Sequence, residues 1–155
     1  MNAEELVRRY VAGERNFSGV DLGDTDFTDV GLIEVDLSGI NLSNAILEQA
    51  YMEGVNLSGA KLVNAYMSQS CLEKANLQGA DLSGASLGHA SLREANLTNA
   101  KLVNAYLMST DLPGANLTNA DLKGAEGWEH AWIENSIFHE TIMPDGSIRT
   151  DAPSN

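Results

Sequence analysis

The residues best suited to catalysis or metal binding are few, and their spacing matches no recognisable site. The three histidines, His89, His130 and His139, show no metal-ligand spacing with one another or with the single cysteine, Cys71. The sequence also contains no phosphate-binding loop, nucleophile elbow or dinucleotide-binding fingerprint. We therefore expect a protein that is not an enzyme, has no catalytic residues and binds no cofactor or metal ion.

An acidic segment, 24–29, begins like a calcium-binding loop. Such a loop needs glycine at its sixth position and glutamate at its twelfth, whereas this segment has Asp29 at the sixth position and no glutamate at the twelfth. Calcium binding is therefore not expected, and we interpret the segment as a solvated acidic surface. Cys71 has no activating base nearby in the pattern, so an inert thiol is expected there.

The elements that carry these residues are set by a strict period of five. A large apolar residue stands at every fifth position from Phe17 to Leu122. On an α-helix this period would scatter the side chains around the axis, and on a flat strand it would alternate them between faces. The chain must therefore turn once per repeat. We expect the following members of the series in the core: Phe17, Leu22, Leu42, Leu62, Leu82, Leu102 and Leu122.

Small residues on both sides of each leucine complete the pattern. The position two before the leucine is mostly alanine from Ala45 onward, and in an extended segment it shares the inward face. The position two after is mostly glycine or asparagine, the residues that accept a positive φ in a tight turn. Extended triplets joined by tight turns predict a polygonal tube.

Two consecutive units, 75–79 and 80–84, read Ala-Asn-Leu-Gln-Gly and Ala-Asp-Leu-Ser-Gly. This pattern resembles the pentapeptide repeat proteins, and the resemblance extends without interruption over residues 15–124. It implies an all-β solenoid, a right-handed four-sided β-helix with four pentapeptides per coil. The segments at both ends look like those of cyanobacterial members of this family.

The two ends of the chain depart from the repeat. Residues 1–14 are expected to form a capping helix with Asn2 as its N-cap, and the pairs Leu6–Tyr10 and Val7–Val11 are expected to cover the open coil. After Leu122 the register breaks, and a shift of one residue restores a weak pattern. Residues 125–155 are therefore expected to hold degenerate repeats, a C-terminal cap and a frayed tail.

Aromatic residues are concentrated in this C-terminal segment: Trp128, Trp132 and Phe138. One interpretation is a C-terminal cap on the core. The other is a dimer seam, because the family resemblance implies tail-to-tail association. The chain is accordingly expected to be either a monomer or a tail-to-tail homodimer.

With four units per coil, residues twenty apart should stack at the spacing of neighbouring strands. One outward column would then be an asparagine ladder and the next would alternate in charge, with Lys61, Asp81, Lys101 and Asp121. A third column and its edges collect outward apolar residues: Ile46, Tyr51, Val63, Tyr66, Val103, Tyr106 and Met108. This set is either a candidate interaction patch or simply residues that suit β-strands.

The formal net charge is −13. Residues 16–60 contain no lysine or arginine but eight acids: Asp21, Asp24, Asp26, Asp29, Glu34, Asp36, Glu48 and Glu53. Such a surface repels nucleic acid and anionic membranes, and no apolar run is long enough to cross a membrane. We expect a soluble cytoplasmic protein with no direct contact to nucleic acid or membrane.

Two functions are compatible with these observations. The first is a non-enzymatic scaffold for protein–protein interaction with a protein partner that the sequence does not identify. The second follows from the family resemblance: some pentapeptide repeat proteins are acidic rods that occupy the DNA site of a type II topoisomerase such as gyrase. An acidic DNA mimic is therefore the alternative.

Overall fold

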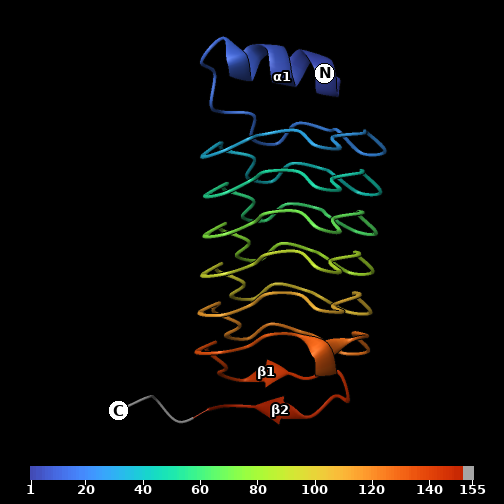
Figure 1. The fold of residues 1–155 in the computed structure, drawn as a ribbon, viewed down its shortest axis with the longest axis vertical. Helices are drawn as coiled ribbons and strands as arrows, with labels where there is room; N and C mark the ends of the chain where they lie inside the picture. The colour runs from blue at the N-terminus through green and yellow to red at the C-terminus, as the bar shows by residue number, and fades with distance from the viewer. Residues whose placement is uncertain (152–155) are drawn as a thin grey trace.

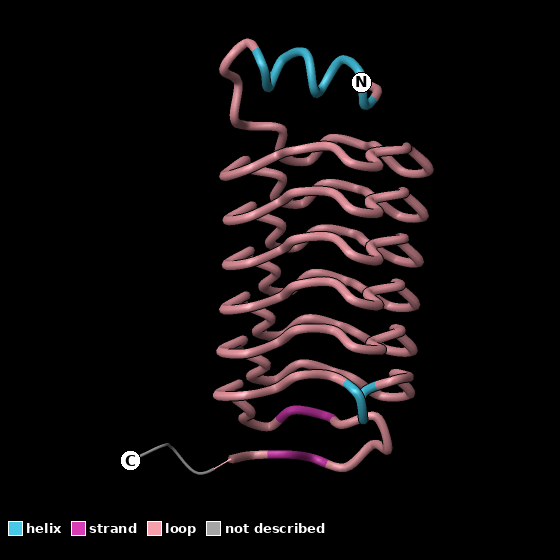
Figure 2. The backbone as a smooth tube through the Cα atoms, viewed as in Figure 1, coloured by secondary structure: helices cyan, strands magenta, loops and turns pink. Residues whose placement is uncertain are grey.

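The computed structural model describes residues 1–151 of the chain, and it shows a column of stacked coils (Figure 1). Helix α1, Ala3–Val11, lies across the N-terminal end of the column. The short helix η1, Trp128–His130, and the two-residue strands β1, Thr141–Ile142, and β2, Ile148–Arg149, lie at the C-terminal end. Figure 2 shows that the rest of the chain up to residue 151 runs as turns and short straight segments.

The coils are joined by parallel bridges between residues twenty positions apart, beginning with Asn16 and Asp36. Each straight segment bonds to both neighbouring coils. The Leu62 N–H donates to the Asp81 carbonyl at 2.7 Å, and the Lys61 N–H donates to the Ile40 carbonyl at 2.9 Å. The twenty-residue coil predicted from the stacking of columns is therefore confirmed.

The corners follow from the residue two positions after each leucine. Its φ is positive, 56° at Asn64 and 69° at Gly84, and the turn closes when the Ala65 N–H donates to the Leu62 carbonyl at 3.1 Å. Lys74 adopts the same conformation, with φ of 57°, although lysine is not among the side chains that favour it. The repetition of coil-to-coil bonds imposes the corner even where the residue type does not favour it.

The core is a narrow pillar of aliphatic side chains. The seven expected core residues, Phe17, Leu22, Leu42, Leu62, Leu82, Leu102 and Leu122, are between 0% and 2% exposed. Alanines such as Ala65 and Ala85 fill the space between the leucines and are fully buried. In the first coils the space among Leu6, Leu37 and Leu47 admits no water molecule, so the interior there is packed.

Helix α1 contributes one buried side chain to this pillar. The Asn2 Oδ1 accepts the Glu5 N–H at 2.9 Å, as expected of an N-cap, and Leu6 is 0% exposed within the core cluster. Tyr10 is partly buried against the core, whereas Val11 is 78% exposed. The prediction that a Val7–Val11 pair helps to cover the coil is therefore wrong, since Val11 lies on the solvent side of the helix.

One additional residue shifts the register near the C-terminus. Bridges there join residues 21 positions apart, as between Asp111 and Trp132, and η1 holds the extra residue. Strand β2 then folds back antiparallel to β1.

The prediction of a frayed tail over residues 150–155 is wrong for Thr150 and Asp151. The Thr150 hydroxyl accepts the Glu140 N–H at 2.8 Å, and the Asp151 N–H donates to the Phe138 carbonyl at 3.0 Å. These bonds fasten the chain after β2 to the preceding layer. The remainder of the predicted tail, 152–155, lies outside the described residues.

Candidate interaction surface

Four columns of bridged residues define the four outward surfaces of the coils. We name them the asparagine face, the charged face, the tyrosine face and the mixed face. The asparagine face carries the column Asn16, Asp36, Asn56, Asn76, Asn96 and Asn116, and the charged face carries Asp21, Asn41, Lys61, Asp81, Lys101 and Asp121. The tyrosine face carries Asp26, Ile46, Tyr66, Ser86, Tyr106 and Glu126. The mixed face carries Gly31, Tyr51, Cys71, Ser91, Asp111 and Trp132.

The asparagine face is bonded to itself along the axis. The Asn76 amide donates to the Asn56 Oδ1 at 3.2 Å, and the Asn96 amide donates to the Asn76 Oδ1 at the same distance. Each Oδ1 also accepts a backbone N–H two residues further along, as Asn76 does from Gln78 at 3.2 Å. The predicted ladder is confirmed here, and it occupies these side chains with structural bonds.

Asp36 continues the same ladder toward the N-terminus. Its Oδ1 accepts the Ser38 N–H at 2.9 Å and the Asn56 amide at 3.0 Å. These hydrogen bonds, led by the one from the Ser38 backbone, favour the carboxylate and lower the pKa of Asp36 below its ordinary value. A negative charge is therefore part of an otherwise uncharged column.

The charged face alternates as predicted and contains one close pair. The Lys101 Nζ lies 3.8 Å from the Asp81 Oδ2. Burial opposes ionisation of Asp81, but hydrogen bonds from Ser83 and the charge of Lys101 outweigh it, so the pKa of Asp81 is lowered. Because both side chains contact solvent, the pair contributes little to stability.

The tyrosine face differs because its large side chains have no such bonds. Ile46, Tyr66 and Tyr106, which we call the tyrosine stripe, are 36%, 51% and 41% exposed. The Tyr106 ring lies on Gly88, since a Cβ at Gly88 would stand 3.0 Å from its Cε1 atom. Between the two tyrosines the column holds Ser86, whose hydroxyl lies 3.0 Å from that of Ser68.

The predicted patch is smaller than its seven residues. Val63 and Val103 belong to the charged face, one corner before the stripe, and Tyr51 belongs to the mixed face, one corner after it. Only Met108 shares the segment of the stripe, two residues after Tyr106. A single straight segment is three residues long, so residues that seem close in sequence are separated by a corner.

The tyrosine face is also acidic. Its five-residue units contain Asp26, Asp29, Glu48 and Glu126 but no lysine or arginine. The Thr28 hydroxyl and backbone N–H donate to Asp26 at 2.7 and 2.9 Å, and these bonds lower the pKa of Asp26. The stripe is thus bordered by negative charge at both of its ends.

The repeats match a known family over most of the chain. Eight copies of the pentapeptide repeat model match, within residues 16–49, 50–88, 75–112 and 90–126. The chain belongs to the pentapeptide repeat family. Proteins of this family form right-handed quadrilateral β-helices, in agreement with the four columns of this solenoid. No curated protein matches the chain.

Solved structures that are similar to this pentapeptide repeat protein include those of Rfr23, itself a pentapeptide repeat protein, and QnrB1. Rfr23 from the cyanobacterium Cyanothece 51142 is 30% identical with a TM-score of 0.52, and the match covers 85% of this chain and all of Rfr23. QnrB1, a plasmid-mediated fluoroquinolone resistance protein, is 18% identical with a TM-score of 0.53 over 84% of this chain and 71% of QnrB1. At that identity, the likeness to QnrB1 shows the fold alone.

The aromatic residues at the C-terminal end of this pentapeptide repeat protein do not form one exposed seam. Phe138 is 2% exposed, with the Trp128 ring edge-on at 6.0 Å and the Arg149 guanidinium 3.7 Å above its ring centre. Trp132 is 65% exposed on the mixed face. The packing of Phe138 and Trp128 against the core agrees with the interpretation of a C-terminal cap, whereas Trp132 points outward; the dimer seam stays a prediction.

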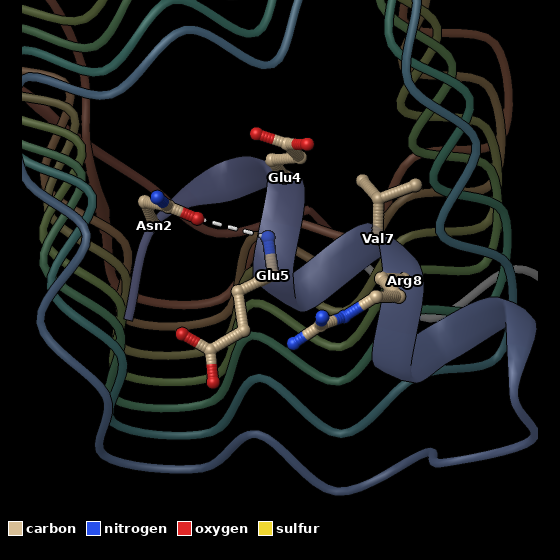
Figure 3. A pocket seen from close by; sticks show the side chains of 5 residues that line it. All are labelled: Asn2, Glu4, Glu5, Val7 and Arg8. Carbon is tan, nitrogen blue, oxygen red and sulfur yellow. Dashed lines mark hydrogen bonds between the residues drawn. The ribbon is translucent and has the colours of Figure 1, made fainter.

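A hollow with a volume of about 550 Å³ lies along α1. Its lining comes entirely from α1 and its N-cap, and Figure 3 shows Glu4 and Val7 pointing away from Glu5 and Arg8. The Asn2 amide oxygen is occupied by the N-cap bond drawn in that figure. These side chains do not converge on a common point, so the hollow is a weak candidate for a ligand site.

Among residues 1–151, no group of histidine, cysteine and acidic side chains is arranged to hold a metal ion. Over the same residues, α1 and η1 both lack the length and the apolar character that a membrane-crossing helix needs.

Proposed function

We propose that this pentapeptide repeat protein is a non-enzymatic scaffold that binds another cytoplasmic protein through its tyrosine face. The observation that supports this proposal is the tyrosine stripe itself: Ile46, Tyr66 and Tyr106 are exposed in one straight column. In the proposed interaction the partner covers this column, and neither nucleic acid nor membrane takes part, since the net charge is −13.

Tyrosine suits such a role because of its size and its few rotatable bonds. Interfaces are enriched in tyrosine, and a few aromatic residues at their centre carry most of the binding energy. The backbone beneath the stripe is bonded to both neighbouring coils, as where the Tyr66 N–H donates to the Ala45 carbonyl and the Met67 N–H donates to the Ser86 carbonyl. Little backbone entropy is therefore lost when a partner binds.

The alternative of a DNA mimic is supported by one observation, the acidic first coils. Residues 16–60 combine eight acids with no base over roughly 11 Å of axis, given the spacing of neighbouring strands. Duplex DNA carries about one charge per 1.7 Å. However, Asp21, Asp26 and Asp36 belong to three different faces, so the acids encircle the coil instead of following one side. We rank mimicry second.

The scaffold is tested by comparing variants in affinity capture from the native host. The double variant Tyr66→Ser/Tyr106→Ser should lose a protein that the wild type retains. Tyr51→Ser is the matched control, because Tyr51 is 60% exposed but lies on the mixed face. Retention by the double variant, or equal loss by Tyr51→Ser, would reject the tyrosine face as the site.

A gyrase supercoiling assay separates the two functions. A scaffold should leave supercoiling unchanged when the protein is added up to micromolar concentrations. Inhibition or protection of gyrase that disappears when the acids at Asp21, Asp24 and Asp26 are replaced by asparagine would favour the mimic.

A further inference from the structure

We propose that the tyrosine face accepts a proline-rich basic segment, held as a polyproline II helix that runs along the solenoid axis. The proposal rests on the proposed function, since it names the kind of protein segment that this face would bind. It is carried by three properties of the face: the spacing of its two tyrosines, the way in which a ring is presented, and the sign of the surrounding charge.

The spacing follows from the register of the coils. Tyr66 is bridged to Ser86 and Ser86 to Tyr106, so the two tyrosines stand two strand spacings apart, about 9.6 Å. A polyproline II helix repeats every three residues, about 9.3 Å. On an α-helix the corresponding repeat of seven residues is about 10.5 Å, and on a strand same-side residues are about 6.8 Å or 13.6 Å apart. The polyproline II repeat matches most closely.

The tyrosines are presented in a way that suits proline rings. Because Gly88 has no side chain, the Tyr106 ring lies against the backbone of the preceding coil and remains 41% exposed on its other side. Ser86 and Ser68 are small and bonded to each other, so the column is low between the two rings. Two exposed tyrosine side chains separated by a serine fit prolines at the first and fourth positions of a segment.

The acidic residues of the tyrosine face favour basic residues on both sides of the prolines in the bound segment. Glu48 lies in the coil before Tyr66 and Glu126 in the coil after Tyr106, while the five-residue units of this face contain no lysine or arginine. Asp26 adds a further charge beyond Ile46. Lysine or arginine residues flanking the prolines would therefore be attracted at both ends, and binding should weaken as salt is added.

The direct test is fluorescence anisotropy with a labelled synthetic peptide that has two prolines three positions apart and lysines at both ends. We expect saturable binding to the wild-type protein. Tyr66→Ser/Tyr106→Ser should weaken this binding by about tenfold or more, as for loss of aromatic anchors, whereas Tyr51→Ser should stay within about twofold. A peptide of identical composition with its prolines four positions apart should bind at least about fivefold more weakly, since its rings no longer match the repeat.

Three outcomes would overturn the proposal. These are equal binding of the two proline spacings, equal or tighter binding of an alanine-rich helical peptide with the same lysines, and equal weakening by Tyr51→Ser. Failure of the proposed function looks different. If the tyrosine double variant loses a captured protein while the proline peptide does not bind, the tyrosine face remains an interaction surface and only the polyproline proposal falls. If capture is also unchanged, both fall.

Discussion

The asparagine face and the tyrosine face share the same coils, corners and core, yet they use their outward side chains differently. On the asparagine face, Asn56, Asn76 and Asn96 bond to one another from coil to coil. On the tyrosine face, Tyr66 and Tyr106 alternate with a serine and present their rings to solvent. In a solenoid each outward column is independent of the core, so one side can stabilise the stack while another remains available for binding.

The largest effect should come from the core that both faces share. Leu82→Ala should lower the free energy of unfolding by about 2–5 kcal/mol, because Leu82 is 0% exposed and the narrow pillar cannot close around the cavity. Urea denaturation measures this loss. The matched control is Ser83→Ala, which removes an outward-facing hydroxyl that donates to Asp81. This change should lower the free energy of unfolding by less than about 0.5 kcal/mol. Equal losses would contradict the assignment of inward and outward positions.

A smaller loss of unfolding free energy is expected when a side chain of the asparagine ladder is removed, compared with an exposed side chain next to the ladder. Asn76→Ala should cost about 1–2 kcal/mol, since it removes an acceptor for the Asn96 amide and for the Gln78 N–H. Gln78→Ala, on an exposed side chain of the same coil, should leave the unfolding free energy within about 0.5 kcal/mol of the wild type. A silent Asn76→Ala would show that the ladder does not stabilise the stack.

Replacing Asp36 should change the unfolding free energy least at neutral pH. Its effect should become clear only in acid. Its pKa is lowered in the folded protein, so its contribution is present above the ordinary aspartate pKa, about 3.9, and is lost as pH falls through the lower folded value. Asp36→Asn keeps the acceptor oxygen and should match the wild type near pH 7. Below about pH 4 its stability should decline less steeply than that of the wild type. Identical pH profiles in urea denaturation would contradict this role.

Much of the fold could be predicted because each coil repeats the same local rules. The leucine at every fifth position fixed the inward side, and the columns at twenty-residue intervals gave the ladder and the alternation of Lys101 with Asp81. The prediction of a register shift after Leu122 agrees with the 21-residue step from Asp111 to Trp132. In these regions the five-residue repeat of the sequence also sets which residues pair between coils, because four repeats make one coil.

The details of the surface could not be predicted in the same way. The twenty-residue stacking placed Tyr51 at the edge of the column that holds Tyr66, but only the structure shows that a corner puts the two side chains on different faces. The burial of Phe138 depends on β2 folding back over the last layer, with Arg149 stacked on the ring. The exposure of Val11 depends on how α1 is rotated on the first coil. Such contacts lie outside the repeat, so its period carries no information about them.

The most direct test of the central claim, that the tyrosine face is not needed for folding, is urea denaturation of Tyr66→Ser/Tyr106→Ser beside Leu82→Ala. Both tyrosine rings are 41% or more exposed, whereas Leu82 is fully buried. We predict that the double variant keeps a cooperative transition and loses clearly less unfolding free energy than the single core variant. An equal or greater loss in the double variant would show that the stripe is part of the structure and would contradict its assignment as a binding surface.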